Sequence, residues 1–309
     1  MRNKVSIIGA GFVGTMVAQR IAEKNLADVV LVDIIEGLPQ GKALDISQSA
    51  SIEGIDVKIK GTNDFSEIKD SRIVVFTAGF PRTPGMSREE LAGENGNIIK
   101  SVTEKIREKA PDCIIIMVTN PLDVMTHLAW KVSGFPAQRV IGMAGILDTV
   151  RYKSFLAEEL GVSISDIQAL VLGGHGDAMV PVESYTTLKG MPISQFIKPE
   201  RLQAIIQRTK DGGAEIVKLL KTGSAWHAPS SSTLVMVEAI LMDSKRILPV
   251  SVYLEGEYGI SGTYIGAPIK LGATGVEKIY EIDLSDDELA ALRRSADVVK
   301  KTFEGMNIL

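Results

Sequence analysis

Short, mostly apolar runs recur through the first half of the chain. They are rich in β-branched residues and cover Val5–Ile8, Val29–Val32, Ile73–Phe76 and Ile114–Val118. Runs of this kind are typical of strands that are buried on both faces. Helical patterns lie between them, over Val13–Lys24, around Lys42–Ala50 and over Ile98–Lys109. Because strands and helices alternate at this spacing, the pattern predicts an α/β fold with a doubly wound parallel sheet.

The second half of the chain has a mixed pattern. Helical segments are predicted over Arg151–Leu160, Leu202–Leu220, Leu234–Met242 and Ser285–Met306. The last of these opens with a capping box formed by Ser285 and Glu288. Apolar and polar residues alternate from Val250 to Leu254, and the glycine-rich turns that follow indicate antiparallel strands. We therefore predict two domains, an α/β domain over residues 1–143 and a mixed α+β domain over residues 144–309.

The composition excludes several classes of protein. The 309 residues are 45% hydrophobic and 23% charged, and a formal net charge of -4 provides no basic field for nucleic acid or for an anionic membrane. No apolar run approaches the roughly 20 residues that span a bilayer, and glycines interrupt the apolar run that a signal peptide needs. The one cysteine, Cys113, lies in an apolar run and is predicted to be a buried filler. These features predict a soluble, cytoplasmic protein.

A glycine motif, Gly9-Ala10-Gly11-Phe12-Val13-Gly14, follows the first predicted strand and opens the first helix. In this setting Gly9 permits a tight turn, Gly11 lets a pyrophosphate approach the main chain, and Gly14 lets the helix pack closely on the strand. The phosphates would lie at the positive end of the helix dipole. The motif is weak alone, but its position predicts a Rossmann-type, dinucleotide-binding domain over residues 1–143.

An acid at the end of the second predicted strand, Asp33, indicates which dinucleotide is bound. An acid at this distance from the glycines accepts hydrogen bonds from the adenosine ribose hydroxyls. Its charge would repel a 2′-phosphate, and the next residues, Ile34 and Ile35, provide no cation to hold one. The sequence therefore predicts NAD rather than NADP.

A histidine between glycines is the strongest candidate for catalysis. His175 lies in Gly173-Gly174-His175-Gly176-Asp177, where the glycines let the main chain bring an imidazole into a cleft. Asp148 and Arg151 lie three positions apart near the start of a predicted helix, so both side chains can face that cleft. The acid would orient the imidazole and raise its pKa, and the guanidinium would bind a carboxylate. A surface ion pair is the structural alternative for these two residues.

A proline- and glycine-rich loop, residues 80–88, follows the strand Ile73–Phe76 and carries Arg82 and Arg88. It leaves the carboxyl edge of the sheet, where ligands bind in doubly wound folds. A loop of this composition with two arginines can close over a bound anion. Solvated loop arginines are common, so the loop gains weight only beside the other motifs.

These segments, together with Asn120-Pro121, occur in the order seen in the lactate/malate dehydrogenase superfamily. The chain resembles most the lactate-dehydrogenase-like malate dehydrogenases of bacteria and archaea, and the resemblance extends from the first strand to the last helix. It implies an NAD-dependent 2-hydroxy-acid dehydrogenase that forms a homodimer or homotetramer and uses no metal. The mixed α+β domain would then be the substrate and catalytic domain.

The resemblance also assigns roles to residues. His175 would exchange the proton of the substrate hydroxyl, Asp148 would orient the imidazole, and Arg151 would clamp the C1 carboxylate. Arg88 would polarise the C2 carbonyl oxygen, and Asn120 would bind near that oxygen and the nicotinamide. The implied cofactor contacts are Gly9, Gly11, Phe12, Val13, Gly14, Asp33, Ala78, Gly79, Asn95, Val118 and Asn120.

Arg82 favours malate and oxaloacetate as the substrate pair. Lactate dehydrogenases usually carry glutamine at the corresponding loop position, whereas Arg82 offers a charge to a second carboxylate. A monocarboxylate such as pyruvate would leave that charge desolvated and unpaired, at a cost of about several kcal/mol. Small residues in the segment 224–227 would give room for the carboxymethyl group, while Trp226 and Trp130 are predicted to be core residues.

Three alternatives remain open. A lactate dehydrogenase would share the whole motif set but would prefer pyruvate. A dinucleotide-binding module without turnover would lack the histidine, its acid or the arginine clamp. An NAD-using glycosidase would require metal ligands, and Cys113 with the scattered histidines at 127, 175 and 227 forms no cluster in the sequence.

Overall fold

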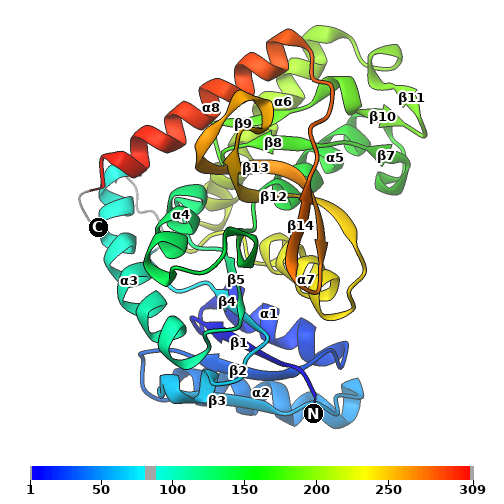
Figure 1. Cartoon of the computed structure of the whole chain (residues 1–309). Helices are drawn as coiled ribbons and strands as arrows, with labels where there is room; N and C mark the ends of the chain where they lie inside the picture. Colours follow the sequence, from blue (N-terminus) through cyan, green and yellow to red (C-terminus); the bar gives the residue numbers. More distant parts are fainter. Residues whose placement is uncertain (1, 81–87, 307–309) are drawn as a thin grey trace.

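A computed structural model describes residues 2–80 and 88–306 (Figure 1). The first half forms six parallel strands in the spatial order β3-β2-β1-β4-β5-β6. They are β1 (Lys4–Ile8), β2 (Asp28–Val32), β3 (Ile59–Thr62), β4 (Ile73–Phe76), β5 (Ile114–Met117) and β6 (Val140–Gly142). This is the strand order of a Rossmann-type domain, so the predicted fold class is confirmed.

Both faces of the parallel sheet are covered by helices. Helices α1 (Phe12–Glu23) and α7 (His227–Leu241) pack on one face, and α3 (Arg88–Lys109) and α4 (Leu122–Ser133) pack on the other. Successive side chains of a strand point to opposite faces, so Ile7 joins the first core and Ile8 the second. This two-sided burial explains why the central strands appear in the sequence as mostly apolar runs. Helix α2 (Leu38–Glu53) leads into β3 at the sheet edge.

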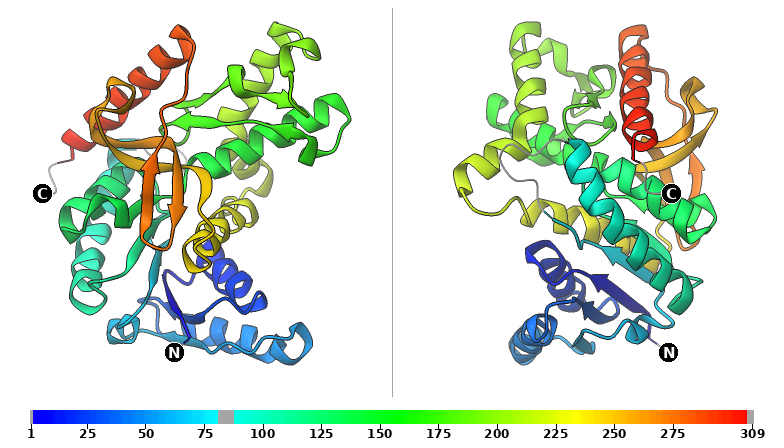
Figure 2. Two further views of the ribbon diagram at one scale, coloured as in Figure 1. Left: turned by 45° about the vertical axis from the view of Figure 1, so that its right-hand side comes forward. Right: turned by 90° about the vertical axis from the view of Figure 1, so that its left-hand side faces the viewer.

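The sheet continues into the second half with antiparallel strands (Figure 2). Strand β12 (Arg246–Glu255) lies beside β6, followed by β13 (Ser261–Gly272), β8 (Val171–Gly173) and β9 (Met179–Pro181), while β14 (Gly275–Ile279) pairs with β13. A small separate sheet contains β7 (Ile167–Gln168), β10 (Thr187–Leu188) and β11 (Met191–Pro192). Helices α5 (Gly145–Leu160), α6 (Pro199–Leu220) and α8 (Asp286–Glu304) complete this part, which confirms the predicted mixed α+β architecture.

Short 3-10 helices connect several of these elements. They are η1 (Phe65–Ile68), η2 (Ala137–Arg139), η3 (Ile164–Asp166), η4 (Glu183–Tyr185), η5 (Ile193–Gln195) and η6 (Glu257–Gly259). The predicted capping box of α8 is present, because Ser285 Oγ accepts from the Glu288 main chain and Glu288 Oε2 accepts from the Ser285 main chain at 2.9 Å. Glu288 also accepts two hydrogen bonds from Ser184, which ties the start of α8 to η4.

Some elements differ from the sequence prediction. Strand β3 was not predicted because it is a short edge strand with Lys60 and Gly61 at its centre. Gly61 lies against the main chain of Pro39, where an added Cβ would fall 2.0 Å from the carbonyl oxygen. Helix α3 begins at Arg88 rather than at Ile98, since its first turns are rich in glycine and glutamate and carry few apolar residues.

The described part of the chain has few features outside this plan. None of its helices is long and apolar enough to cross a membrane, and no three of its His, Cys, Asp or Glu side chains are grouped to hold a metal ion. Cys113 is fully buried, and burial raises the pKa of its thiol to about 12. The prediction that this cysteine is a filler is consistent with both observations.

An aromatic cluster joins α4, β12, β13 and α8. The His127 imidazole stacks on the Phe303 ring with centroids 3.8 Å apart and lies among Trp130, Tyr253 and Tyr264. His127 is 3% exposed, and neither ring nitrogen has a hydrogen-bond partner in the described part of the chain. Burial, and to a smaller extent the Lys131 charge, lowers the pKa of His127 to about 4. The imidazole is therefore neutral in the folded protein.

The pH dependence of stability should carry the signature of His127. Its pKa is about 4 in the folded chain against 6.5 for the free side chain, so the unfolded chain binds the extra proton. The contribution of the neutral imidazole is complete above the higher value and is lost as the pH falls toward the lower one, by on the order of 3 kcal/mol. His127→Phe keeps the ring stack and should remove this loss in denaturant titrations across the interval. The exposed His227→Phe is the control, and equal pH slopes for His127→Phe and the unmutated chain would contradict the assignment.

Candidate active site

The glycine motif forms the turn between β1 and α1. Gly9 has φ +106°, and a Cβ there would meet the Ala78 main-chain nitrogen at 2.7 Å. A Cβ on Gly14 would lie 1.9 Å from the Gly9 carbonyl oxygen, so this glycine is required for the close approach of α1 to the turn. Gly11 is exposed, and a Cβ there would meet no atom within 4 Å. The open side of the loop is therefore at Gly11, where a phosphate could approach the first turn of α1.

Asp33 braces this turn from the end of β2. One carboxylate oxygen accepts from the Ala10 N–H at 2.7 Å, and the other accepts from the Ile35 N–H at 3.0 Å. Ile34 and Ile35 follow it as exposed apolar side chains. Asp33 thus places a carboxylate beside the glycine turn, in the place where an adenosine ribose would be recognised.

The carboxyl ends of β4 and β5 form the next part of the site. Thr77 lies under the glycine turn, and its hydroxyl donates to the carbonyls of Ile8 and Gly9 at 3.0 and 3.1 Å. Thr119 donates to the Ala78 carbonyl at 2.7 Å. Both threonines were missed in the sequence, although each directly follows a predicted strand at the ligand-binding edge of the sheet. Ala78, Gly79, Val118 and Asn120 line the same edge and are partly or fully exposed.

Asn95, on α3, is fully buried and joins two of these loops. Its amide oxygen accepts from the Phe80 N–H at 2.7 Å, and its amide nitrogen donates to the Asn120 carbonyl at 2.8 Å. The side chain thus holds the start of the arginine loop against Asn120, which precedes a cis peptide bond to Pro121. In the structure the Asn95 amide is bonded to these main-chain partners. Its predicted contact with the cofactor stays a prediction.

The structure brings His175 and Asp148 together. His175 Nδ1 lies 2.9 Å from Asp148 Oδ2, although the two residues are on the β8–β9 loop and on α5. A carboxylate only accepts, so Nδ1 carries the hydrogen and Nε2 is left to exchange a proton with a ligand. Burial alone would lower the pKa of His175, but the charge and hydrogen bond of Asp148 outweigh it, and the pKa is raised above 6.5. The pair has the geometry of a histidine base oriented by an acid.

Arg151 lies on the same face of α5 as Asp148, as predicted. Its Nη1 is 3.6 Å from Asp148 Oδ1, while its Nε is buried without a hydrogen-bond partner among the described residues. The arginine side chain packs against α6 at Gly212 and Gly213. A Cβ on Gly212 would lie 3.4 Å from Arg151 Cδ, and a Cβ on Gly213 would lie 3.8 Å from Arg151 Nη1. A buried guanidinium with an unpaired Nε is a site for a planar anion such as a carboxylate.

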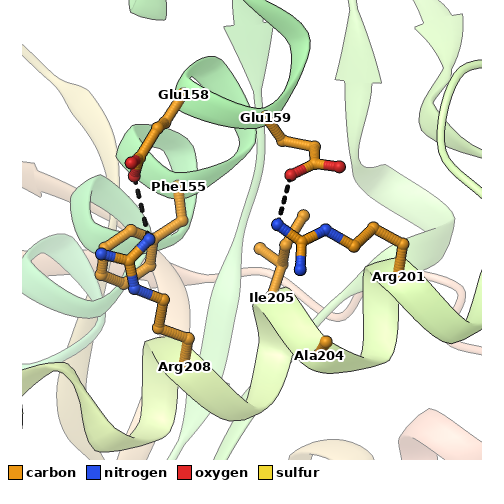
Figure 3. A pocket seen from close by; sticks show the side chains of 7 residues that line it. All are labelled: Phe155, Glu158, Glu159, Arg201, Ala204, Ile205 and Arg208. Atoms are coloured by element: carbon orange, nitrogen blue, oxygen red, sulfur yellow. Dashed lines mark hydrogen bonds and ion pairs between the residues drawn. The ribbon is translucent and has the colours of Figure 1, made fainter.

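Other arginines between α5 and α6 are already neutralised. Figure 3 shows a surface pocket two helical turns beyond Arg151, where Arg201 pairs with Glu159 at 2.6 Å and Arg208 pairs with Glu158 at 2.9 Å. The Arg208 guanidinium also stacks over Phe155. These ion pairs fasten α6 to α5 and balance the charges of Arg201 and Arg208, whereas the buried Nε of Arg151 has no hydrogen-bond partner among the described residues.

The loop that carries His175 is held from two distant elements, α8 and α4. Ser295, on α8, accepts from the Gly174 N–H at 2.8 Å and donates to the Ala178 carbonyl at 2.6 Å, so it closes the loop. Asp123, on α4, accepts from the His175 N–H at 2.8 Å. A Cβ on Gly174 would lie 2.8 Å from Val299 Cγ2, which explains the glycine at that position. Neither Ser295 nor Asp123 was predicted from the sequence.

Trp226 corrects one sequence expectation. It is half-buried and stacks on Phe12 of the glycine turn, with ring centroids 5.0 Å apart, and so it is not a core residue. This contact places the α6–α7 connection beside the glycine turn. Arg82 and the side chain of Arg88 lie outside the described residues, and the structure places neither guanidinium.

The chain is similar to known proteins along nearly its whole length. The NAD-binding domain model of lactate/malate dehydrogenases matches residues 3–142, and the α/β C-terminal domain model matches residues 146–307. Malate dehydrogenase of Roseiflexus sp. (strain RS-1) is 57% identical over 309 residues, 100% of both chains. Malate dehydrogenase of Cryptosporidium parvum superposes with a TM-score of 0.97 at 41% identity and full coverage of both chains. Lactate dehydrogenase of the same organism, solved with lactic acid and NAD, gives 0.96 at 42% identity, covering 99% of this chain and 98% of that one.

Two glycines of the turn should respond differently to alanine. Gly14→Ala introduces a clash with the Gly9 carbonyl and should lower the free energy of unfolding by about 2 kcal/mol or more. Gly11→Ala meets no protein atom and should leave unfolding unchanged, yet weaken NADH binding by roughly tenfold or more because the new methyl group occupies the phosphate approach. Denaturant titration and NADH fluorescence titration of both variants check this. Unchanged NADH affinity in Gly11→Ala would remove the dinucleotide from this turn.

Proposed function

The chain belongs to the lactate/malate dehydrogenase family, and from this premise we propose that it interconverts (S)-malate and oxaloacetate with NAD. The observation that carries the proposal is the His175–Asp148 pair beside Arg151, whose buried Nε has no partner in the described part of the chain. An imidazole that can exchange a proton, next to a guanidinium that can bind a carboxylate, is the arrangement that a 2-hydroxy acid requires. The residues also fit the cofactor, because Gly11 leaves an open approach to α1 and Asp33 stands beside it.

His175 and Asp148 handle the proton. In malate oxidation His175 Nε2 takes the proton of the C2 hydroxyl, and in oxaloacetate reduction it returns that proton to the C2 oxygen. Asp148 keeps the hydrogen on Nδ1 and stabilises the imidazolium that forms. Bound NAD supplies the acceptor, and NADH the donor, of the hydride that moves at C2.

The arginines place the substrate and stabilise charge. Arg151 binds the C1 carboxylate in a two-pronged contact, with its unpaired Nε as one donor. By the family resemblance Arg88 polarises the C2 oxygen, and Asn120, exposed at the end of β5, binds near the same oxygen. The described geometry supports the roles of His175, Asp148 and Arg151, and the role of Arg88 rests on the sequence.

The choice of malate over lactate rests on Arg82. The backbone does not separate the two activities, since a malate and a lactate dehydrogenase superpose on the chain with TM-scores of 0.97 and 0.96. Curated relatives of 51–57% identity carry the name malate dehydrogenase. Arg82 adds a physical reason, because a second cation in the loop suits a substrate with a second carboxylate.

We also propose the organisation that goes with this activity. Residues 1–143 form the NAD-binding domain and residues 144–309 the catalytic domain, which the spans of the two family models support. The single buried cysteine suits a reducing compartment, so we propose that the protein is cytoplasmic. The family resemblance leads us to propose a homodimer or homotetramer. Its predicted partners are malate and oxaloacetate, with neither nucleic acid nor membrane.

Steady-state rates with oxaloacetate and pyruvate test the substrate directly. We expect kcat/KM with NADH to favour oxaloacetate by at least about a hundredfold, because pyruvate leaves one buried charge unpaired. Arg82→Gln should lose most of this preference while its NADH affinity is unchanged. A preference for pyruvate would make the chain a lactate dehydrogenase, and equal losses of NADH affinity and turnover in the variant would indicate a folding defect.

Asp148→Asn tests the base and its orienting acid. The amide removes the charge that raises the pKa of His175, so less imidazolium is present at a given pH. Oxaloacetate reduction needs the protonated ring, and its fall with rising pH should therefore move to lower pH, with kcat reduced by about a hundredfold or more. pH profiles of kcat/KM measure the shift, and kcat at saturating oxaloacetate measures the loss of turnover. A profile identical to that of the unmutated enzyme would contradict the assignment.

A further inference from the structure

A second buried carboxylate lies behind the catalytic histidine. Asp123 is 3% exposed, and its oxygens have separate long-range partners: Oδ2 accepts from the His175 main-chain N–H at 2.8 Å, and Oδ1 accepts from the Ser251 hydroxyl at 2.6 Å. The same Oδ2 lies 3.5 Å from the position of a Cβ on Gly174. The carboxylate is therefore packed directly against the main chain that carries the imidazole.

The position of Asp123 in α4 offsets part of the cost of burying its charge. It lies in the first turn of the helix, where the macrodipole stabilises a negative charge. Both hydrogen bonds that it receives also favour the carboxylate over the acid. No lysine or arginine of the described residues forms an ion pair with Asp123. Its main-chain partner His175 is the residue that becomes positively charged during the reaction.

We propose that Asp123 is a positioning residue of the proposed dehydrogenase, which fixes His175 through its main chain and whose charge, together with that of Asp148, stabilises the imidazolium. The two acids approach the histidine from different elements, Asp148 from α5 at the ring and Asp123 from α4 at the backbone. Arg151, on α5, acts against the two acids because its charge lowers the pKa of His175.

The same short segment would then serve both substrate and base. Asn120 follows β5, the cis bond to Pro121 comes next, and Asp123 lies in the first turn of α4, three residues after Asn120. Asn120 is exposed at the substrate edge, while Asp123 points back to the histidine loop. A shift of the α4 start would move the substrate contact and the proton acceptor together, which keeps their separation constant.

The electrostatic effects around His175 agree with this arrangement. Burial lowers the pKa of the imidazole, Asp148 raises it most, Arg151 lowers it, and Asp123 adds a smaller raising effect. Burial raises the pKa of Asp123 above its ordinary value, and the Asp148 charge adds to this, while the hydrogen bonds from Ser251 and His175 and the His175 charge lower it without removing the rise. The geometry thus predicts coupled titration of Asp123 and His175.

NMR titration of labelled histidine tests the proposal without substrate or cofactor. The chain has three histidines, so the His175 signal can be assigned by comparison with His127→Phe and His227→Phe. Asp123→Asn keeps the size and an acceptor oxygen but removes the charge, and it should lower the pKa of His175 by roughly half a unit or more. Ser251→Ala keeps the charge, removes one hydrogen bond, and should leave that pKa unchanged. An unchanged His175 pKa in folded Asp123→Asn overturns the proposal.

Kinetics and the unmutated protein supply the remaining readouts. Asp123→Asn should lower kcat for oxaloacetate by about tenfold or more while the KM for NADH stays unchanged. If the variant does not fold, aspartate-labelled unmutated protein is used instead. Its Asp123 carboxyl must be ionised at neutral pH and respond at the His175 transition, and a protonated Asp123 overturns the proposal. Because these titrations need no turnover, they succeed or fail independently of the malate assignment.

Discussion

The hydrogen bond between His175 and Asp148 is the interaction on which the site depends. It joins a loop of the antiparallel part to helix α5, and it sets which ring nitrogen is free for a ligand. Neither partner is local to the other, so the pair exists only when the β8–β9 loop and α5 are both correctly placed. The surrounding structure restrains each of them: Ser295 and Asp123 hold the loop, while the ion pairs of Arg201 and Arg208 hold α6 against α5.

The arrangement separates the proposed cofactor site from the site of proton transfer within one continuous sheet. The parallel half offers the glycine turn and Asp33 at its carboxyl edge, and the antiparallel half offers the imidazole and the guanidinium. The stack of Phe12 on Trp226 and the packing of α7 on α1 connect the two halves directly. A dinucleotide held at the turn would therefore lie in a fixed relation to His175, which is the condition for transferring a hydride and a proton in one active site.

Much of this site was predictable because its residues lie in recognisable local sequence patterns. For the glycine turn, for Asp33, and for the spacing of Asp148 and Arg151, the neighbouring residues indicate the local backbone structure. The braces were not predictable, because Asp123, Ser251 and Ser295 are ordinary polar residues in the sequence. Their partners are between 52 and 128 positions away, and only the folded chain brings them together. The fold shows the same contrast: buried central strands appear as apolar runs, whereas the edge strand β3, with Lys60 and Gly61, does not. Trp226 was wrongly predicted to be a core residue for a related reason. In the sequence, an aromatic residue that packs beside the glycine turn cannot be told from one in the core.

The central claim is that a dicarboxylate binds with its central oxygen at His175 and one carboxylate on Arg151. A crystal structure of the protein with NAD and an unreactive dicarboxylate analogue of oxaloacetate tests this most directly. The account predicts a carboxylate paired with the Arg151 Nε, the central oxygen within hydrogen-bond distance of His175 Nε2, and the second carboxylate against the Arg82 guanidinium. A dicarboxylate bound away from Arg151, or a His175 ring remote from both the analogue and the nicotinamide, would contradict it.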